Sequence, residues 1–157
     1  MNNKLRHIIA LVLFTGAIFF TSCDLEDVDP MNEGLGRVTA SINSSSFTAN
    51  SISASLFVTE TDTTFEVVAT DNDDNIITLM VNSLQQISYD VNSANAVAEF
   101  NRNVGSSVSI SENTTGGDIV ISSVNEEAQI ISGSFSFNTD NSTITNGEFA
   151  NINYTIK

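Results

Sequence analysis

Apolar and polar side chains alternate with a period of two over most of the chain beyond residue 37. The clearest runs are 38–42, 52–58 and 65–70, in which apolar residues recur at every second position, and 130–137, in which apolar and small residues alternate around Gly133. Such alternation turns one face of an extended segment toward a core and the other toward water. These runs therefore predict β-strands.

The remaining apolar segments are shorter or less regular. Residues 76–81 are apolar at both parities and predict a more buried strand, and further strands are predicted at 87–89, 96–100, 108–110, 119–121 and 147–156. The last segment does not keep strict parity, which predicts a bulge near Asn151. No segment shows a sustained helical period. The sequence predicts one all-β domain over 36–157, an antiparallel meander of about 8–10 strands that forms a β-sandwich or a flattened lipocalin-like barrel.

The first 22 residues have the pattern of a secretory signal peptide. Lys4 and Arg6 precede an apolar run over 8–20, which is shorter than the roughly 20 apolar residues that span a bilayer. The segment Phe20-Thr21-Ser22-Cys23 resembles the bacterial lipobox, with Phe20 where leucine is usual. The resemblance implies cleavage after residue 22 and attachment of lipid, palmitate included, to Cys23.

Cys23 is the only cysteine in the sequence, so no internal disulfide can form. A lone thiol in an exported protein requires an explanation, and acylation provides one. Each buried methylene contributes roughly 0.8 kcal/mol, so that two or three acyl chains anchor a protein stably. The alternative is a secreted protein with an unmodified cysteine.

Residues 23–35 are predicted to form an acidic tether. Four acids lie between Asp24 and Asp29, followed by the only proline, Pro30, and such a segment stays solvated. It is either a plain spacer or, because it resembles the acidic export signal of lipoproteins in the Bacteroidota, a signal for the outer face of the outer membrane. We therefore expect a lipid-anchored outer-membrane protein that faces the cell exterior.

The charge of the chain excludes one class of partner. All 19 acidic residues follow residue 23, where only Arg37, Arg102 and Lys157 are basic, which gives a net charge of −16 beyond the signal peptide. Binding to nucleic acids depends on lysine and arginine to neutralise phosphates. We expect no nucleic-acid partner, and contact with the membrane only through the lipid anchor.

Residue types needed for most catalytic sites are missing. The only histidine, His7, lies in the signal peptide. Without histidine or a free cysteine, the domain cannot assemble a Ser-His-Asp or Cys-His site, nor the usual zinc or copper sites. Carboxylate chemistry remains, but no pair of acids is singled out, and Glu66 and Glu99 fall on outward parities. We expect no enzymatic activity.

One acidic turn has part of a calcium-loop pattern. Asp71, Asp73 and Asn75 supply oxygen ligands at alternate positions, as at the start of a calcium loop. Ile76 stands where glycine is expected and Asn82 where a bidentate glutamate is expected, so the segment is not an EF-hand. It is either a polar hairpin turn or a calcium site. No other cofactor is expected.

A second short motif concerns glycosylation. Asp62-Thr63-Thr64 resembles the acid–hydroxyl sequon for O-glycosylation in the Bacteroidota. The resemblance implies a glycan on Thr63, and the alternative is an ordinary loop.

The C-terminal segments resemble a known group of proteins. Two segments carry this resemblance, 130–137 with the sequence IISGSFSF and 144–149 with the sequence ITNGEF. They are similar to the "ISGTFSF" and "ITNGxF" strands of small Bacteroidota lipoproteins grouped as a domain of unknown function. Asp73 and Asp74 occupy a turn where such chains often carry glycine. Strand and turn residues specify a fold rather than a chemistry, so the resemblance implies an all-β fold and carries over no assigned activity.

These observations favour a surface-exposed, non-enzymatic β-domain that binds an extracellular protein, glycan or matrix component. The absence of tryptophan and the presence of only two tyrosines favour a protein over a glycan. One alternative is a lipocalin-like carrier, whose phenylalanines would line a cavity for a small apolar ligand. A purely structural role in the envelope is another.

Overall fold

The structure, a computed structural model, describes residues 36–105 and 108–157. The predicted signal peptide 1–22, the lipidation site Cys23 and the tether 23–35 lie outside these residues. The described part contains eleven strands and no helix, and so no helix that could cross a membrane, which confirms the all-β prediction. The strands are β1 (Arg37–Ile42), β2 (Ser45–Val58), β3 (Thr63–Asp71), β4 (Ile76–Val81), β5 (Ser88–Asp90), β6 (Ala96–Asn103), β7 (Ser109–Glu112), β8 (Thr114–Asn125), β9 (Ile130–Thr139), β10 (Thr143–Asn153) and β11 (Thr155–Ile156).

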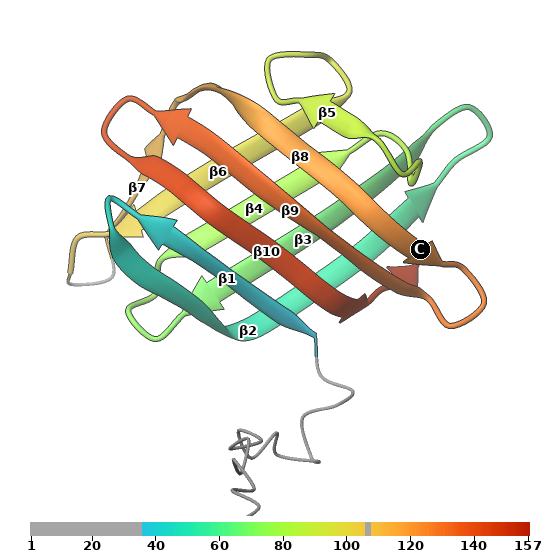
Figure 1. Cartoon of the computed structure of the whole chain (residues 1–157), viewed down its shortest axis with the longest axis horizontal. Coiled ribbons are helices and arrows are strands. Elements are labelled where there is room, and N and C mark those ends of the chain that lie inside the picture. The colour runs from blue at the N-terminus through green and yellow to red at the C-terminus, as the bar shows by residue number, and fades with distance from the viewer. Residues whose placement is uncertain (1–35, 106–107) are drawn as a thin grey trace, which may run out of the picture.

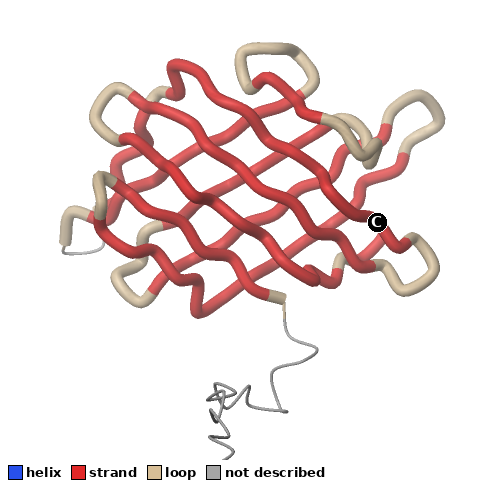
Figure 2. Tube along the Cα trace, viewed as in Figure 1, coloured by secondary structure: helices blue, strands red, loops and turns tan. Residues whose placement is uncertain are grey.

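All strands belong to one strongly curled sheet, a half-barrel with the order β5-β8-β9-β10-β1-β2-β3-β4-β6-β7. Its two halves form crossing layers, with β1, β10, β9 and β8 over β2, β3, β4 and β6 (Figure 1; Figure 2). Every pairing is antiparallel except that of β11 with β2. The meander holds for β1–β4 and for β8–β10. It is broken where β10 pairs with β1, and where β4 pairs directly with β6 while β5 crosses to β8.

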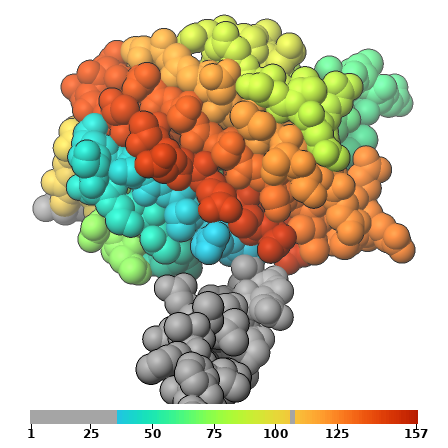
Figure 3. Space-filling model, viewed as in Figure 1, coloured from blue at the N-terminus to red at the C-terminus, as the bar shows by residue number. Residues whose placement is uncertain are grey.

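Strand β2 connects the two layers. Its first residues pair with β1, and from Ala49 onward it pairs with β3. The register with β3 shifts between Ala49 and Ser51, and such a bulge bends a strand and increases its twist. Within the segment between β4 and β6, β5 lies along the edge of β8, where the yellow-green atoms of Figure 3 border the orange ones.

The predicted alternation of buried and exposed positions is confirmed in most strands. In β3 and β9 every second residue is buried. Strand β4 is buried on one face and half-buried on the other, at Ile76, Thr78 and Met80, so no residue of this strand is fully exposed. The core is tightly packed, and a void within it has a volume of about 10 Å³. Its largest fully buried side chains are Phe47, Phe100, Phe137, Phe149, Ile77, Ile119, Ile121, Ile131, Ile144, Ile152, Val38 and Val67.

The predicted bulge near Asn151 is present. The register of β10 with β9 shifts between Phe149 and Ile152, and Asn151 has a φ of 52°. A second shift, at Asn146 with a φ of 51°, was not predicted. The segment predicted as one last strand divides at Tyr154 into β10 and β11, which is why the sheet has eleven strands rather than eight to ten.

Strands β9 and β10 are joined by two reciprocal glycine–phenylalanine pairs. Gly133 lies opposite Phe149, and Gly147 lies opposite Phe135. A Cβ atom on Gly133 would lie 2.3 Å from the Phe149 ring, and one on Gly147 would lie 2.5 Å from the Phe135 ring. Each ring therefore occupies the space that a side chain on the opposite residue would need. This is how aromatic residues compensate for glycine in a sheet.

At one end of the half-barrel a buried carboxylate joins the two layers. Glu112 of β7 has a side chain with 0% exposure, and it accepts a hydrogen bond from Arg102 Nε of β6 at 3.2 Å. It also accepts hydrogen bonds from Thr139 and Ser142 in the β9–β10 turn. A buried charge is costly unless it is paired and hydrogen-bonded. The cluster therefore fixes the β6–β7 hairpin against the opposite layer.

The surroundings of Glu112 change its ionisation. Burial alone would raise the pKa, but the hydrogen bonds from Thr139, Ser142 and Arg102, together with the arginine charge, outweigh it and hold the pKa of Glu112 below its ordinary value. A carboxylate with a depressed folded-state pKa stabilises the fold above its unfolded pKa. That stabilisation is lost as the pH falls through the folded-state pKa.

The first prediction concerns the glycine–phenylalanine pairs. We expect Gly133→Ala to reduce the free energy of unfolding by about 1–3 kcal/mol, because the added Cβ would displace the Phe149 ring or the β8 backbone. This corresponds to a loss of roughly 4–12 °C in melting temperature, measurable by circular dichroism. Ser134→Ala, at the next and outward-facing position, is the control, and equal melting temperatures for the two variants would contradict the proposed role of Gly133.

The second prediction concerns Glu112. We expect Glu112→Gln to lower the stability by about 1–3 kcal/mol at pH 7, because the charge-assisted hydrogen bonds are weakened. The difference in the free energy of unfolding between Glu112→Gln and the unaltered protein should narrow as the pH falls below about 4.3, the ordinary glutamate pKa. It should vanish below the folded-state pKa of Glu112.

Glu148→Gln is the matched control for this experiment, because Glu148 also forms an ion pair with an arginine, Arg37, at 3.2 Å. Unlike the Glu112 side chain, the side chains of Glu148 and Arg37 are exposed, by 52% and 61%. Exposed pairs contribute less than about 1 kcal/mol. Chemical denaturation of the three proteins between pH 7 and pH 3 separates these contributions. A stability gap for Glu112→Gln that stays constant over this range would show that its charge has no role.

Candidate functional site

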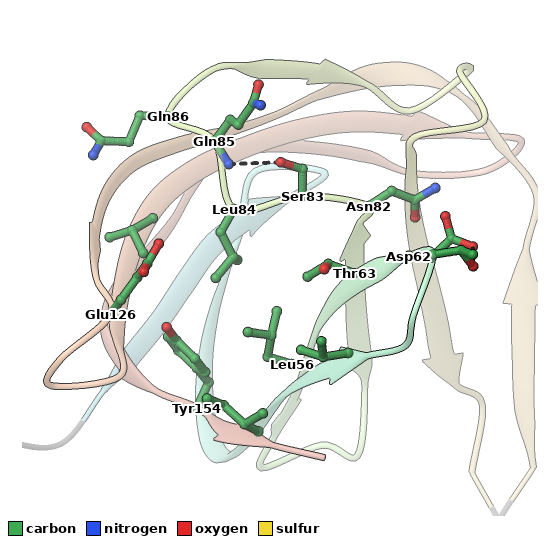
Figure 4. A pocket seen from close by; sticks show the side chains of 14 residues that line it. Leu56, Asp62, Thr63, Asn82, Ser83, Leu84, Gln85, Gln86, Glu126 and Tyr154 are labelled. Atoms are coloured by element: carbon green, nitrogen blue, oxygen red, sulfur yellow. Dashed lines mark hydrogen bonds between the residues drawn. The ribbon is translucent and has the colours of Figure 1, made fainter.

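An open cleft of about 1000 Å³ lies beside the C-terminus, at the end of the half-barrel opposite the β6–β7 hairpin that carries Glu112 (Figure 4). It is bounded by β2, the start of β3, the segment after β4, the β8–β9 turn and the last residues of the chain. Its lining residues are Leu56, Val58, Thr61, Asp62, Thr63, Asn82, Ser83, Leu84, Gln85, Gln86, Val124, Glu126, Tyr154 and Ile156.

The floor of the cleft is apolar. Leu56 and Tyr154 are buried, and the Tyr154 ring packs edge-on against Phe65 with 5.8 Å between ring centroids. Val58 and Ile156 continue this surface to the rim, where they are 51% and 56% exposed. Exposed apolar side chains grouped around a hollow are typical of binding surfaces.

Backbone hydrogen bonds hold the C-terminal residues in place. Lys157 N donates to the Leu56 carbonyl oxygen at 2.9 Å, and Val58 N donates to the Lys157 carbonyl oxygen at 3.2 Å. Tyr154 N donates to the Gln129 carbonyl oxygen at 3.0 Å, which ties the C-terminal segment to the β8–β9 turn. The floor is therefore built on sheet pairing rather than on a free chain end.

The segment over 82–86 covers the cleft from above (Figure 4). The Tyr89 hydroxyl lies 3.1 Å from the carbonyl oxygens of both Ser83 and Gln85. Gln85 N donates to Ser83 Oγ at 3.2 Å, as the dashed line in Figure 4 shows. These bonds fix the backbone, while the side chains of Gln85 and Gln86 are exposed and available to a ligand.

Two carboxylates stand on opposite sides of the cleft. Asp62 lies in the β2–β3 turn, where Thr59 N donates to its carbonyl oxygen at 2.8 Å, and Glu126 lies in the β8–β9 turn (Figure 4). Both side chains are exposed. They give the rim a negative potential on both sides of an apolar floor.

The Tyr154 hydroxyl points into the cleft toward Glu126 (Figure 4). Burial and the charge of Glu126 raise the pKa of Tyr154 above its ordinary value, so the phenol is neutral at physiological pH. Tyr154 as a whole is only 3% exposed, and no buried side-chain oxygen or nitrogen of the described residues lacks a hydrogen-bond partner. The hydroxyl is therefore a polar group that a ligand in the cleft can contact.

The calcium candidates Asp71, Asp73 and Asn75 lie at the other end, in the β3–β4 turn. The Asp71 carboxylate accepts hydrogen bonds from the backbone N–H groups of Asp73 and Asn75, both at 2.9 Å, and from Asn75 Nδ2 at 2.9 Å. Asn75 Oδ1 in turn accepts from Asn103 N at 3.0 Å. This geometry favours the hairpin-turn interpretation, because donors already occupy both Asp71 oxygens. No three acids of the described residues are grouped to hold a metal.

Thr63, the predicted glycosylation site, is half-buried at the start of β3 and lines the cleft. A sugar on its hydroxyl would therefore stand inside the cleft. Its modification stays a prediction. Cys23, the predicted lipidation site, lies outside the described residues.

A second groove, of about 700 Å³, lies where β2 diverges from the ends of β1 and β10. Its one charged side chain, Arg37, already pairs with Glu148. The groove is lined mainly by short and amide side chains, so it offers fewer recognition groups than the cleft.

Neither the cleft nor the buried carboxylate of Glu112 was predicted from the sequence. The cleft is formed by five separate segments, mostly turns, in which no period marks a shared face. Glu112 left no clear signal, because Ile110, which shares its parity in β7, is 43% exposed. Tyr154 was predicted as a core residue, which is correct for its ring but not for its hydroxyl.

Comparison with known proteins shows which family the chain belongs to. No curated protein and no solved structure matches it. The family described as Domain of unknown function (DUF6252) matches residues 36–153, which covers nearly all of the described sheet. The chain therefore belongs to this family of domains of unknown function.

Proposed function

We propose that the protein is a non-enzymatic binding domain, anchored by lipid on Cys23 to the outer face of a bacterial outer membrane, that holds an extracellular partner in the open cleft. The observation that carries this proposal is the contrast between a cleft of about 1000 Å³ and a core void of about 10 Å³. Binding sites are concave and combine apolar surface with polar groups that fix the ligand's orientation. The cleft combines an apolar floor with a polar rim.

The packed core also bears on the carrier alternative. A void of about 10 Å³ has room for about one water molecule, so an apolar ligand cannot sit among the core phenylalanines without expanding the sheet. A ligand must instead lie at the mouth, in contact with solvent. This favours the recognition of a partner over the enclosure of a cargo.

The geometry of the acids supports a non-enzymatic role. A glycosidase needs one carboxyl group kept protonated, usually by an apolar environment, whereas Asp62 and Glu126 are both exposed at the rim. The buried Glu112 is at the opposite end and already bonded to Arg102 and Thr139. We therefore assign binding rather than hydrolysis to the cleft.

The third prediction tests the cleft as the binding surface. A photo-crosslinking amino acid placed at Gln86 or at Thr61, both exposed cleft positions, should give an adduct of the same added mass when the full-length protein is expressed in its own cells. The same amino acid at Asn138, exposed near the Glu112 end, should not. Mass spectrometry of the purified protein reads the result.

A further variant excludes adventitious capture. Ser83→Trp would fill part of the cleft without altering Gln86, and it should remove the adduct. An adduct that persists in this variant, or one that forms equally from Asn138, would show that the partner binds elsewhere.

The fourth prediction tests the anchor and its location. Protease added to intact cells should degrade the protein, which should otherwise fractionate with the outer membrane. Cys23→Ala should release it from the membrane fraction, because the acyl chains supply the binding energy. Protection from protease until the cells are broken would place the protein in the periplasm and contradict the surface location.

A further inference from the structure

All charged side chains that line the cleft are acidic. They are Asp62 and Glu126, which stand on opposite sides of it. None of the cations among the described residues lines the cleft. Arg37 and Arg102 are bonded to Glu148 and Glu112, and Lys157 Nζ lies 5.2 Å from the centroid of the Phe57 ring, outside the cleft. The rim acids thus have no basic neighbour to neutralise them.

The floor between the two acids suits an aliphatic chain. Leu56 and Tyr154 form this part of the floor, and Leu84 points toward them from the covering segment (Figure 4). Lysine and arginine bury their methylene stems on apolar surface while their charged heads stay at its edge. A ligand with apolar stems and terminal positive charges would match both the floor and the rim.

Tyr154 adds a polar group to the apolar floor. It is 3% exposed, and its hydroxyl points into the cleft toward Glu126. The phenol oxygen can accept a hydrogen bond from an ammonium group that Glu126 holds. A cationic ligand would therefore meet both a carboxylate and a hydrogen-bond acceptor at this side of the cleft.

We propose that the cleft recognises a basic–apolar–basic peptide segment of a protein partner, with its two cations at Asp62 and Glu126 and its apolar residue on Leu56 and Leu84. This deepens the proposed function and rests on it. Opposite charges arranged across an interface give specificity and speed association. The acidic surface of the domain would attract such a segment over a longer range.

Two other ligand classes fit less well. Anionic ligands are opposed by both rim acids. Sugars are usually recognised by stacking on an exposed aromatic face, but the Tyr154 ring is buried against Phe65 and presents only its hydroxyl edge. A small free amine shares the chemistry of a lysine side chain, so the experiment must separate these two sources.

The fifth prediction uses ¹⁵N-labelled full-length protein in a neutral detergent and three probes. The probes are acetyl-Lys-Leu-Lys-amide, the same peptide with norleucine in place of both lysines, and n-pentylamine. We expect the lysine peptide to shift the amide signals of 82–86, 124–126 and Tyr154. The norleucine peptide and n-pentylamine should each bind at least about 10-fold more weakly, because one lacks the charges and the other the second cation and the peptide.

Three variants assign the interaction to named groups. Glu126→Gln should weaken binding of the lysine peptide roughly 3- to 10-fold, and Tyr154→Phe about 2- to 10-fold, as for the loss of one hydrogen bond. Glu127→Gln is the matched control, because it removes the same charge from the adjacent exposed residue outside the cleft, and it should leave the affinity within about 2-fold. The unperturbed signals of each variant report that its fold is intact.

The remaining outcomes separate this inference from the proposed function. Equal binding of the norleucine peptide in the cleft would overturn the inference and leave the cleft as an apolar binding site. Equal binding of n-pentylamine would replace the protein partner with a small amine. Signal shifts that are spread over the outer faces of the sheet and are unchanged in Glu126→Gln would show non-specific attraction to the acidic surface and overturn the inference. The proposed function would still be tested by the crosslinking experiment at Gln86.

Discussion

The reciprocal pairing of Gly133 with Phe149 and of Gly147 with Phe135 is the contact on which the rest of the sheet depends. Each phenylalanine fills the space left by the opposite glycine, so β9 and β10 have only one register in which both rings fit. A slip by one residue would also turn every side chain to the wrong face. Because β10 pairs with β1, this register fixes how the C-terminal half of the chain joins the N-terminal meander.

The same packing determines where function can reside. Rings that lie directly on the backbone of the neighbouring strand leave an interior with no space for a ligand, and the void of about 10 Å³ reflects this. The two ends of the half-barrel then differ. At one end Glu112 bonds the β6–β7 hairpin to the β9–β10 turn, whereas at the other end the layers separate and the cleft opens between them. A binding domain built in this way presents its ligand site at the rim rather than inside.

Much of the fold could be predicted from the sequence because strand burial follows a local period. The alternation at 65–70 and 130–137 gave the strands and their inward faces, and the broken parity after Phe149 gave the bulge at Asn151. Pairing between distant segments left no such local signal. Nothing in the tripeptide of β5 indicates that it crosses to β8, and the pairing of β10 with β1 joins residues more than 100 positions apart. The cleft could not be predicted for the same reason, because turns from several hairpins form it.

The two arginines of this acidic domain both form ion pairs within the sheet. Arg102 is bonded to a fully buried carboxylate, and Arg37 joins β1 to β10 across the centre of the sheet. Both arginines therefore have partners on neighbouring strands and neither faces the cleft. Glu112 has a depressed pKa because of its donors, whereas Asp62 and Glu126 meet no cation at the rim. Within the described domain the acids thus separate into those that stabilise the sheet and those that remain available to a partner. Only the second kind surrounds an apolar floor, into which the Tyr154 hydroxyl points.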